Sequence, residues 1–142
     1  MEQDNERVSS FFRFEDLRIY HKALDYIYWV YRATSTFPES EHFLLASSFN
    51  KAAQAIAINI AEGSARNKAQ FIYYLKSAKT SVRECIVFTS IALQSGFISD
   101  ETSEDSRMYL MELTKMIGAL IASLQKSERE GRPSQDEEKE LD

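Results

Sequence analysis

The fold of this chain is decided by one stretch of its sequence, FIYYLKSAKTSVRECIVFTSIA (residues 71–92). Small and apolar residues recur in it at alternating intervals of four and three positions, at Phe71, Leu75, Ala78, Val82, Cys85, Thr89 and Ala92. This seven-residue repeat draws one continuous stripe along a helix and is typical of left-handed helix packing. The stretch therefore predicts a long helix that packs lengthwise against other helices.

Signals for both ends of this helix flank the stretch. Asn67 and Gln70 have the spacing of a capping box, in which each side chain satisfies a free backbone amide of the first turn. Gly96 is the residue that commonly ends a helix in the left-handed conformation, with Phe97 and Ile98 folding back after it.

Three more helices are predicted by the same kind of periodicity, over residues 15–37, residues 41–62 and from about residue 99 onward. Pro38 should end the first helix, Ser40 should cap the second, and Gly63 should end the second in the left-handed conformation. The expected core lines are Leu45, Phe49, Ala52, Ile56 and Ile60 on the second helix and Leu110, Leu113, Ile117, Leu120 and Leu124 on the fourth.

The first helix carries two apolar stripes side by side. One contains Leu17, Tyr20, Leu24, Ile27 and Tyr31, and the other contains Ile19, Ala23, Tyr26 and Val30. Two stripes are more than one neighbouring helix can cover, so we expect this helix to contact two other helices or a second subunit.

Four helices joined by loops of a few residues must turn back on one another, so the fold class is all-α, an antiparallel up-and-down four-helix bundle. We assign the bundle to residues 14–127, with a flexible N-terminal segment at 1–13 and an acidic, disordered C-terminal tail at 128–142. The bundle carries twelve basic and twelve acidic side chains, whereas residues 128–142 carry three and seven. Most of the net charge of −5 therefore belongs to the tail.

The composition indicates a cytoplasmic protein that does not enter a membrane. No apolar run approaches the length of about 20 residues that a membrane-spanning helix needs, and no signal peptide is recognisable at the N-terminus. A single cysteine rules out an intrachain disulfide.

We find no catalytic site, no metal site and no cofactor site in the sequence. A two-iron centre in a bundle needs Glu-x-x-His on two helices, and the only match runs from Glu39 to His42, at a helix start. Cys85 lies on the core line, where a small apolar thiol is common and where neither histidine is placed to activate it.

Two polar residues, Asn59 and Glu62, follow or flank the buried stripe at the end of the second helix, and Arg66 follows Gly63 in the next turn. Polar groups there need partners. We expect them to tie the turn between the second and third helices by hydrogen bonds and to fix its register. Ligand binding is the alternative that we weigh against this.

A basic row follows the third helix, at Lys68, Lys76, Lys79 and Arg83, with no acid between them until Glu84. Such a row attracts phosphates. The two interpretations, a solvated face paired with acids of a neighbouring helix and a contact surface for nucleic acid, stay equally open at this point.

The sequence resembles the 23S rRNA intervening-sequence protein family, also called the bacterial four-helix bundle family. The resemblance covers about residues 14–125. It rests on Phe14–Leu17 with Ala23, Phe37-Pro38 with Glu41, Ala52-Ala53, Asn59–Gly63 with Arg66, then Phe71, Leu75, Ala78, Ser81 and Glu84, and Gly96–Ile98. It implies an antiparallel four-helix bundle that assembles into a homopentamer.

Relatives in the family include the accessory variability proteins of diversity-generating retroelements, which resemble strongly basic pentamers that bind nucleic acid and a reverse transcriptase. The neutral bundle of this chain departs from that pattern, as do Ala57 and Thr80, where the family often has Pro and Gly. From the basic row and the homo-oligomer that the resemblance implies, we expect a non-enzymatic scaffold that binds RNA or DNA through this row. The alternative is an adaptor that binds only another protein.

Overall fold

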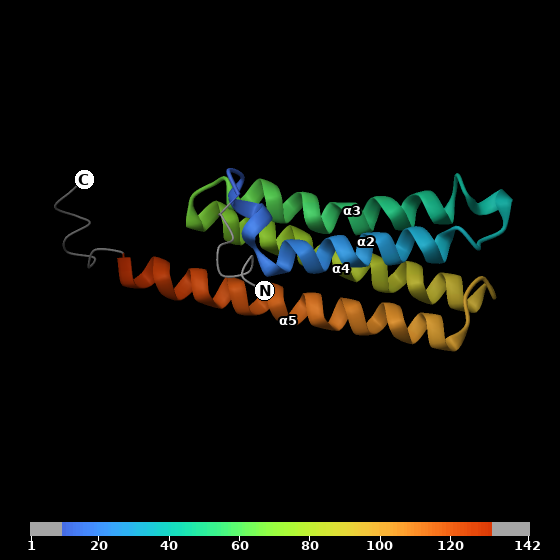
Figure 1. Cartoon of the computed structure of the whole chain (residues 1–142). Helices are drawn as coiled ribbons and strands as arrows, with labels where there is room; N and C mark the ends of the chain where they lie inside the picture. The colour runs from blue at the N-terminus through green and yellow to red at the C-terminus, as the bar shows by residue number, and fades with distance from the viewer. Residues whose placement is uncertain (1–9, 132–142) are drawn as a thin grey trace, which may run out of the picture.

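The computed structural model describes residues 10–131, and within this range the chain forms four α-helices, two short 3-10 helices and no β-strand. In chain order the elements are the 3-10 helix η1 (Arg13–Asp16), α2 (Arg18–Thr34), the 3-10 helix η2 (Glu39–Glu41), α3 (Leu45–Ser64), α4 (Lys68–Gln94) and α5 (Asp100–Gly131). The four α-helices lie lengthwise beside one another and alternate in direction (Figure 1). The predicted all-α, four-helix fold is confirmed.

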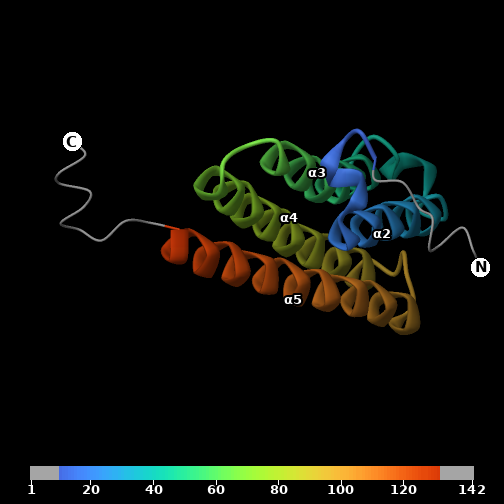
Figure 2. The same ribbon diagram turned by 60° about the vertical axis from the view of Figure 1, so that its left-hand side comes forward.

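Each α-helix packs against two neighbours, in the order α2, α3, α4, α5 and back to α2. The bundle therefore has four outer faces, each formed by two adjacent helices. Helix α5 is the longest, and its end reaches beyond the other three helices (Figures 1 and 2).

The core contains all seven positions of the repeat in residues 71–92, each of them buried. Helix α4 begins after Asn67 and ends before Gly96, as the sequence predicts, but of the two hydrogen bonds of the expected capping box the described residues show only the one that Asn67 accepts. Asn67 Oδ1 accepts a hydrogen bond of 2.9 Å from the backbone amide of Gln70. At the other end Gly96 has a φ of 76°, and Phe97 donates its backbone N–H to the carbonyl of Ala92 at 2.9 Å.

Helix α2 turns only one of its two apolar stripes fully into the core. Ile19, Ala23, Tyr26 and Val30 are buried together with Ile27. The rest of the other stripe lies at the seam with α3, where Tyr20 and Leu24 are half-buried and Tyr31 is 43% exposed. The helix also begins later than expected, since Leu17 is extended and separates η1 from α2.

The predicted cap of the second helix is wrong. Ser40 lies in η2, and α3 begins only at Leu45, after Leu44, whose side chain forms no capping hydrogen bond. The chain after Pro38 forms a 3-10 turn, in which the amide of Glu41 donates to the Pro38 carbonyl at 2.8 Å. This turn delays the start of the α-helix.

The role predicted for Gly63 is also wrong. Helix α3 continues through this residue to Ser64, and Gly63 does not have a positive φ. A Cβ atom at Gly63 would lie 2.7 Å from Tyr74 Cβ and 2.8 Å from Phe71 Cδ1. Glycine is needed here because the first turns of α4 pass too close to α3 for any side chain.

Helical structure extends slightly beyond residues 14–127, the range that we assign to the bundle. At the start, the backbone amide of Ser10 donates to the Asp16 carboxylate, and η1 begins at Arg13, within the segment that we expected to be flexible. At the end, α5 continues through residues 128–131 because no helix breaker precedes Gly131. The remaining parts of the two segments, 1–9 and 132–142, lie outside the described residues.

Candidate nucleic-acid interface

The basic row of α4 lies on the flank of this helix that faces α5. Lys76, Lys79 and Arg83 are spaced by three and four residues, so they share one side of the helix. Lys68 marks the direction of that side, since its Nζ donates a 2.5 Å hydrogen bond to Ser127 Oγ on α5. Lys68 therefore lies on the same flank of α4 as the other three residues, nearer the start of the helix.

Three of these cations are not neutralised by the fold. Within residues 10–131, no ion pair joins Lys76, Lys79 or Arg83 to an acidic side chain. Arg83 donates only to the hydroxyl of Thr80, at 3.2 Å. The pairing with acids of a neighbouring helix, which the sequence left open, does not occur in the described part of the chain. Glu84 is exposed, lies about 140 degrees around the helix from Lys79 and about 80 degrees from Lys76, and forms no ion pair with either.

Helix α5 adds two basic residues that sequence reasoning missed. A groove of about 480 Å³ between α4 and α5 is lined by Arg107 and Lys115, together with Ile86, Leu110 and Met111. Both cations lie on the flank of α5 that faces α4. We call the set Lys76, Lys79, Arg83, Arg107 and Lys115 the α4–α5 basic face. The sequence could have revealed this face through the antiparallel pairing of α4 and α5. This pairing places residues near position 110 of α5 beside residues near position 86 of α4.

One acid interrupts the α4–α5 basic face. Glu104 lines the same groove and is exposed. It forms no ion pair with a residue of the described range. The α4–α5 basic face thus carries five cations and one carboxylate in a bundle that is neutral in sum, and opposite charges must dominate elsewhere on its surface.

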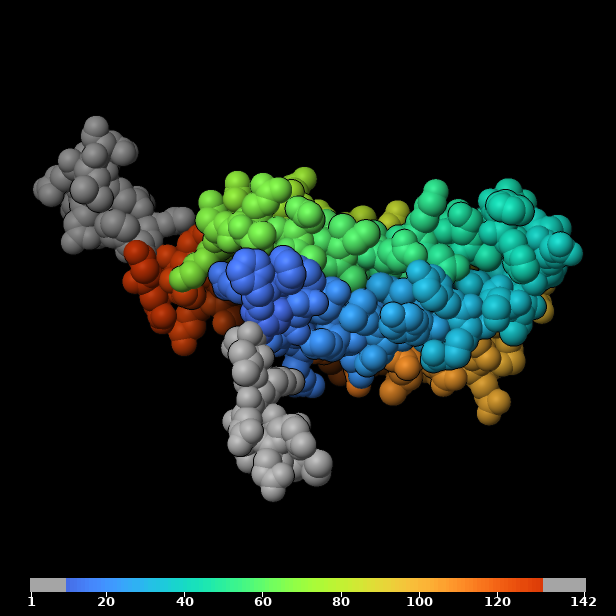
Figure 3. Space-filling view, turned by 45° about the horizontal axis from the view of Figure 1, so that its top comes forward, coloured from blue at the N-terminus to red at the C-terminus, as the bar shows by residue number. Residues whose placement is uncertain are grey.

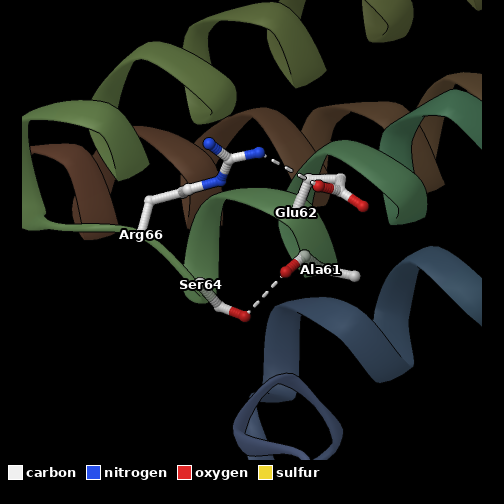
Figure 4. Close-up of polar contacts among 4 residues, drawn as sticks. All are labelled: Ala61, Glu62, Ser64 and Arg66. Carbon is white, nitrogen blue, oxygen red and sulfur yellow. Dashed lines mark hydrogen bonds and ion pairs between the residues drawn. The ribbon is translucent and has the colours of Figure 1, made fainter.

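The polar motif at the end of α3 ties the turn in part, as expected. Arg66 pairs with Glu62 at 3.6 Å, and its guanidinium lies 5.4 Å from the ring centroid of Tyr74 on α4. Figure 4 shows this ion pair, and beside it the hydroxyl of Ser64, which donates to the Ala61 carbonyl at 2.9 Å. Arg66 therefore connects the end of α3 to the start of α4.

Asn59 does not take part in this turn. Its amide donates to the backbone carbonyl of Ala55, one turn earlier on the same helix, at 2.8 Å. The side chain is half-buried and satisfies its own helix. Of the motif residues, only Glu62, Gly63 and Arg66 are thus brought together at the contact with α4.

The chemically reactive groups of the bundle are poorly placed for catalysis. Cys85 is fully buried, and burial raises the pKa of its thiol to about 12. His21 is exposed, and its Nε2 lies 2.6 Å from the Glu15 carbonyl. Among residues 10–131 no group of three His, Cys, Asp or Glu side chains is arranged to hold a metal ion. No helix in that range is long and apolar enough to cross a membrane.

A family model described as 23S rRNA-intervening sequence protein matches residues 15–119, a range that contains α2, α3, α4 and most of α5. Arg107 and Lys115 of α5 and the whole basic row of α4 fall inside the matched range. The search of curated proteins finds no match.

Proposed function

We propose that this chain, which belongs to the 23S rRNA-intervening sequence protein family, acts without catalysis as a homo-oligomeric scaffold that binds RNA or DNA through the α4–α5 basic face. The observation that carries the proposal is the absence of ion pairs at Lys76, Lys79 and Arg83 within the described residues. Cations left unpaired along one face are available to phosphate oxygens.

The geometry of the α4–α5 basic face suits a sugar-phosphate backbone. Lys76 and Arg83 are seven residues apart on α4, which corresponds to about 10 Å along the helix axis. Arg107 and Lys115 form a second row on the adjacent helix. Two parallel rows of cations can follow a phosphate backbone without reading base edges, so we expect binding with little sequence preference.

Self-assembly is supported by a different face of the bundle. A groove of about 390 Å³ runs between α2 and α3, on the side of the molecule that Figure 3 shows. Its walls are nearly all apolar or aromatic, and Tyr28 and Ile58 in it are 56% and 58% exposed. We call it the α2–α3 apolar groove. Exposed apolar surface of this kind marks interfaces.

A second copy is the occupant that we propose for this groove, and a pentamer is the assembly that we expect. The α2–α3 apolar groove and the α4–α5 basic face lie on opposite sides of the bundle, since the helices follow one another in the order α2, α3, α4, α5. Burial of the first therefore leaves the second accessible. A closed ring would repeat the basic face once in each subunit and add the fields of its copies.

The test is a titration of labelled single-stranded and duplex RNA with the protein at two salt concentrations. We expect measurable affinity that falls steeply with salt, because phosphate contacts release counterions. The triple variant Lys76→Gln/Lys79→Gln/Arg83→Gln should bind more weakly and with a flatter salt dependence. A matched variant, Arg18→Gln/Arg32→Gln/Lys51→Gln, removes the same charge from exposed positions on α2 and α3 and should bind nearly as the parent does.

Two outcomes would contradict the proposal. If the parent shows no binding at low salt, the adaptor that binds only protein becomes the better account. If the two triple variants lose affinity equally, binding depends on overall charge and not on the α4–α5 basic face.

A further inference from the structure

A third surface feature lies where α2 meets α5. Here a pocket of about 420 Å³ is lined by Lys22, Trp29, Asp105, Met108, Tyr109 and Glu112. Two aromatic rings, two carboxylates and one ammonium thus meet in one depression. Neither the basic row of α4 nor the polar motif of α3 contributes to it, and the function proposed above does not use it. We call it the α2–α5 pocket.

The aromatic wall of the pocket is held from beneath by a buried side chain. Tyr26 is fully buried and stacks on Trp29 with a centroid distance of 5.7 Å and an interplanar angle of 8°. The same Tyr26 ring lies 5.7 Å from that of Tyr109, and Trp29 and Tyr109 are 6.2 Å apart. The rings of Trp29 and Tyr109 are therefore fixed in place before any ligand arrives.

The pocket already holds one cation, supplied by the chain itself. The ammonium of Lys22 lies 2.5 Å from a carboxylate oxygen of Glu112 and 5.7 Å from the ring centroid of Tyr109. Its hydrogen bond to Glu112 raises the pKa of Lys22, against the opposing effect of burial. Half of the pocket, Tyr109 with Glu112, thus binds an ammonium group.

The other half of the pocket also combines an aromatic ring with a carboxylate, but no cation of the described residues forms an ion pair with this carboxylate. Trp29 is half-buried and offers the aromatic surface, and Asp105 offers an exposed carboxylate that forms no ion pair within residues 10–131. Beside them Met108 is 53% exposed. A flexible thioether adapts to varied apolar side chains, which is why methionine is frequent at surfaces that bind polypeptides.

We propose that the α2–α5 pocket binds an arginine or lysine side chain from a basic segment of a partner protein, with the cation between Trp29 and Asp105. A guanidinium can stack on the indole and donate to the carboxylate at the same time. A free metal ion does not fit, since only two of the six lining residues are carboxylates and one of these, Glu112, already binds Lys22. A polypeptide does, because Met108 extends the contact with an apolar surface next to the charged one.

The pocket contains its own reporter, because Trp29 is the only tryptophan of the chain. The full-length protein is titrated at low ionic strength with the blocked peptide Gly-Arg-Leu-Arg-Gly, and the emission of Trp29 is recorded. We expect a saturable change with this peptide and none with Gly-Gln-Leu-Gln-Gly. Asp105→Asn should weaken binding roughly fivefold. Lys22→Gln should tighten it roughly threefold, since Glu112 and Tyr109 then become available to the peptide.

Two control variants separate the pocket from the overall charge. Glu104→Gln changes the charge by the same amount as Asp105→Asn, but Glu104 lies on the other flank of α5. Arg32→Gln matches Lys22→Gln from an exposed position outside the pocket. Both should leave the affinity within twofold of the parent.

The proposal is overturned if the arginine peptide gives no saturable change, or if each control variant matches its pocket variant. It is also overturned if Asp105→Asn only lowers the mass of the assembly and leaves peptide binding unchanged, which would make the pocket an interface between copies. RNA binding by the α4–α5 basic face is measured separately with the variants of α4, so the failure of either idea leaves the other standing.

Discussion

The hydroxyl of Tyr26 on α2 lies 2.8 Å from the hydroxyl of Ser106 on α5, eighty positions further along the chain and inside the core. Ser106 in turn lies 2.8 Å from the hydroxyl of Thr89 on α4, which donates to the Cys85 carbonyl at 2.8 Å. Three helices are thus joined by one chain of buried hydroxyl groups. Such a network fixes the axial register of the helices, because a shift by one turn would leave buried polar groups unpaired.

Removing the middle hydroxyl should therefore cost more than removing an ordinary hydrogen bond. We expect Ser106→Ala to lower the free energy of unfolding by about 1–3 kcal/mol, since the hydroxyls of Tyr26 and Thr89 both lose a partner. In the double variant Ser106→Ala/Tyr26→Phe, the decrease in the free energy of unfolding should be smaller than the sum of the decreases in the two single variants. Urea denaturation of the four proteins of this cycle measures the coupling, and additive losses would argue against the network.

The close approach of α4 to α3 makes Gly63 intolerant of a methyl group. We expect Gly63→Ala to destabilise the fold by about 1–3 kcal/mol, because the new Cβ would meet Tyr74 and Phe71. Gly118 is the matched control, since it lies within α5 and, apart from its chain neighbours and the local helix backbone, no atom of the described residues lies within 4 Å of where a Cβ would stand. Gly118→Ala should stabilise by about 0.5–1 kcal/mol through helix propensity. Thermal unfolding followed by circular dichroism distinguishes the two, and equal shifts would show that packing at Gly63 is loose.

Stability should fall in alkaline solution because of two buried acids. Burial raises the pKa of the Cys85 thiol from 9.0 to about 12 and raises the pKa of Tyr26 as well. Above pH 9 the unfolded chain loses protons that the folded chain retains, so the free energy of unfolding decreases as the pH rises. Between pH 8 and pH 10.5 we expect a decrease of about 2 kcal/mol in urea denaturation.

The control for this pH dependence is Cys85→Ala, which removes the thiol and keeps the position small and apolar. Its stability at pH 8 should be lower because of the lost packing, but its decrease between the two pH values should be clearly smaller than that of the parent. An equal decrease in both proteins would assign the alkaline sensitivity to other groups.

Assembly should depend on the α2–α3 apolar groove. Ile58→Glu places a charge in the groove, and we expect light scattering after gel filtration to show the mass falling from several times 16.4 kDa toward that of the monomer. Val87→Glu is the matched control, because Val87 is 55% exposed but lies on α4, outside the groove. A parent that is monomeric at micromolar concentration would refute the assembly, and equal dissociation of both variants would place the interface elsewhere.

The sequence by itself determined which segments are helical and which face of α4 is buried. The repeat from Phe71 to Ala92 needs no partner to be recognised, because the period of a helix is a local property of the backbone. The same holds for Asn67 and Gly96, whose capping roles depend on residues within one turn of them. The basic row was also visible in this way, since residues spaced by three and four positions share a helix face wherever that helix lies.

Only the tertiary structure decided what depends on the distance between helices. Gly63 was expected to end α3 because glycine commonly does so, but the approach of α4 shows that it is needed for space. Periodicity could not say which stripe of α2 faces the core, because both fit a helix equally well. The register between two helices likewise decides that Arg107 and Lys115 lie beside the basic row. It also decides that Trp29 and Asp105 line the same pocket. That register is set by packing and by the hydrogen bonds that join Tyr26, Ser106 and Thr89, and a local pattern does not show which residues of different helices pair.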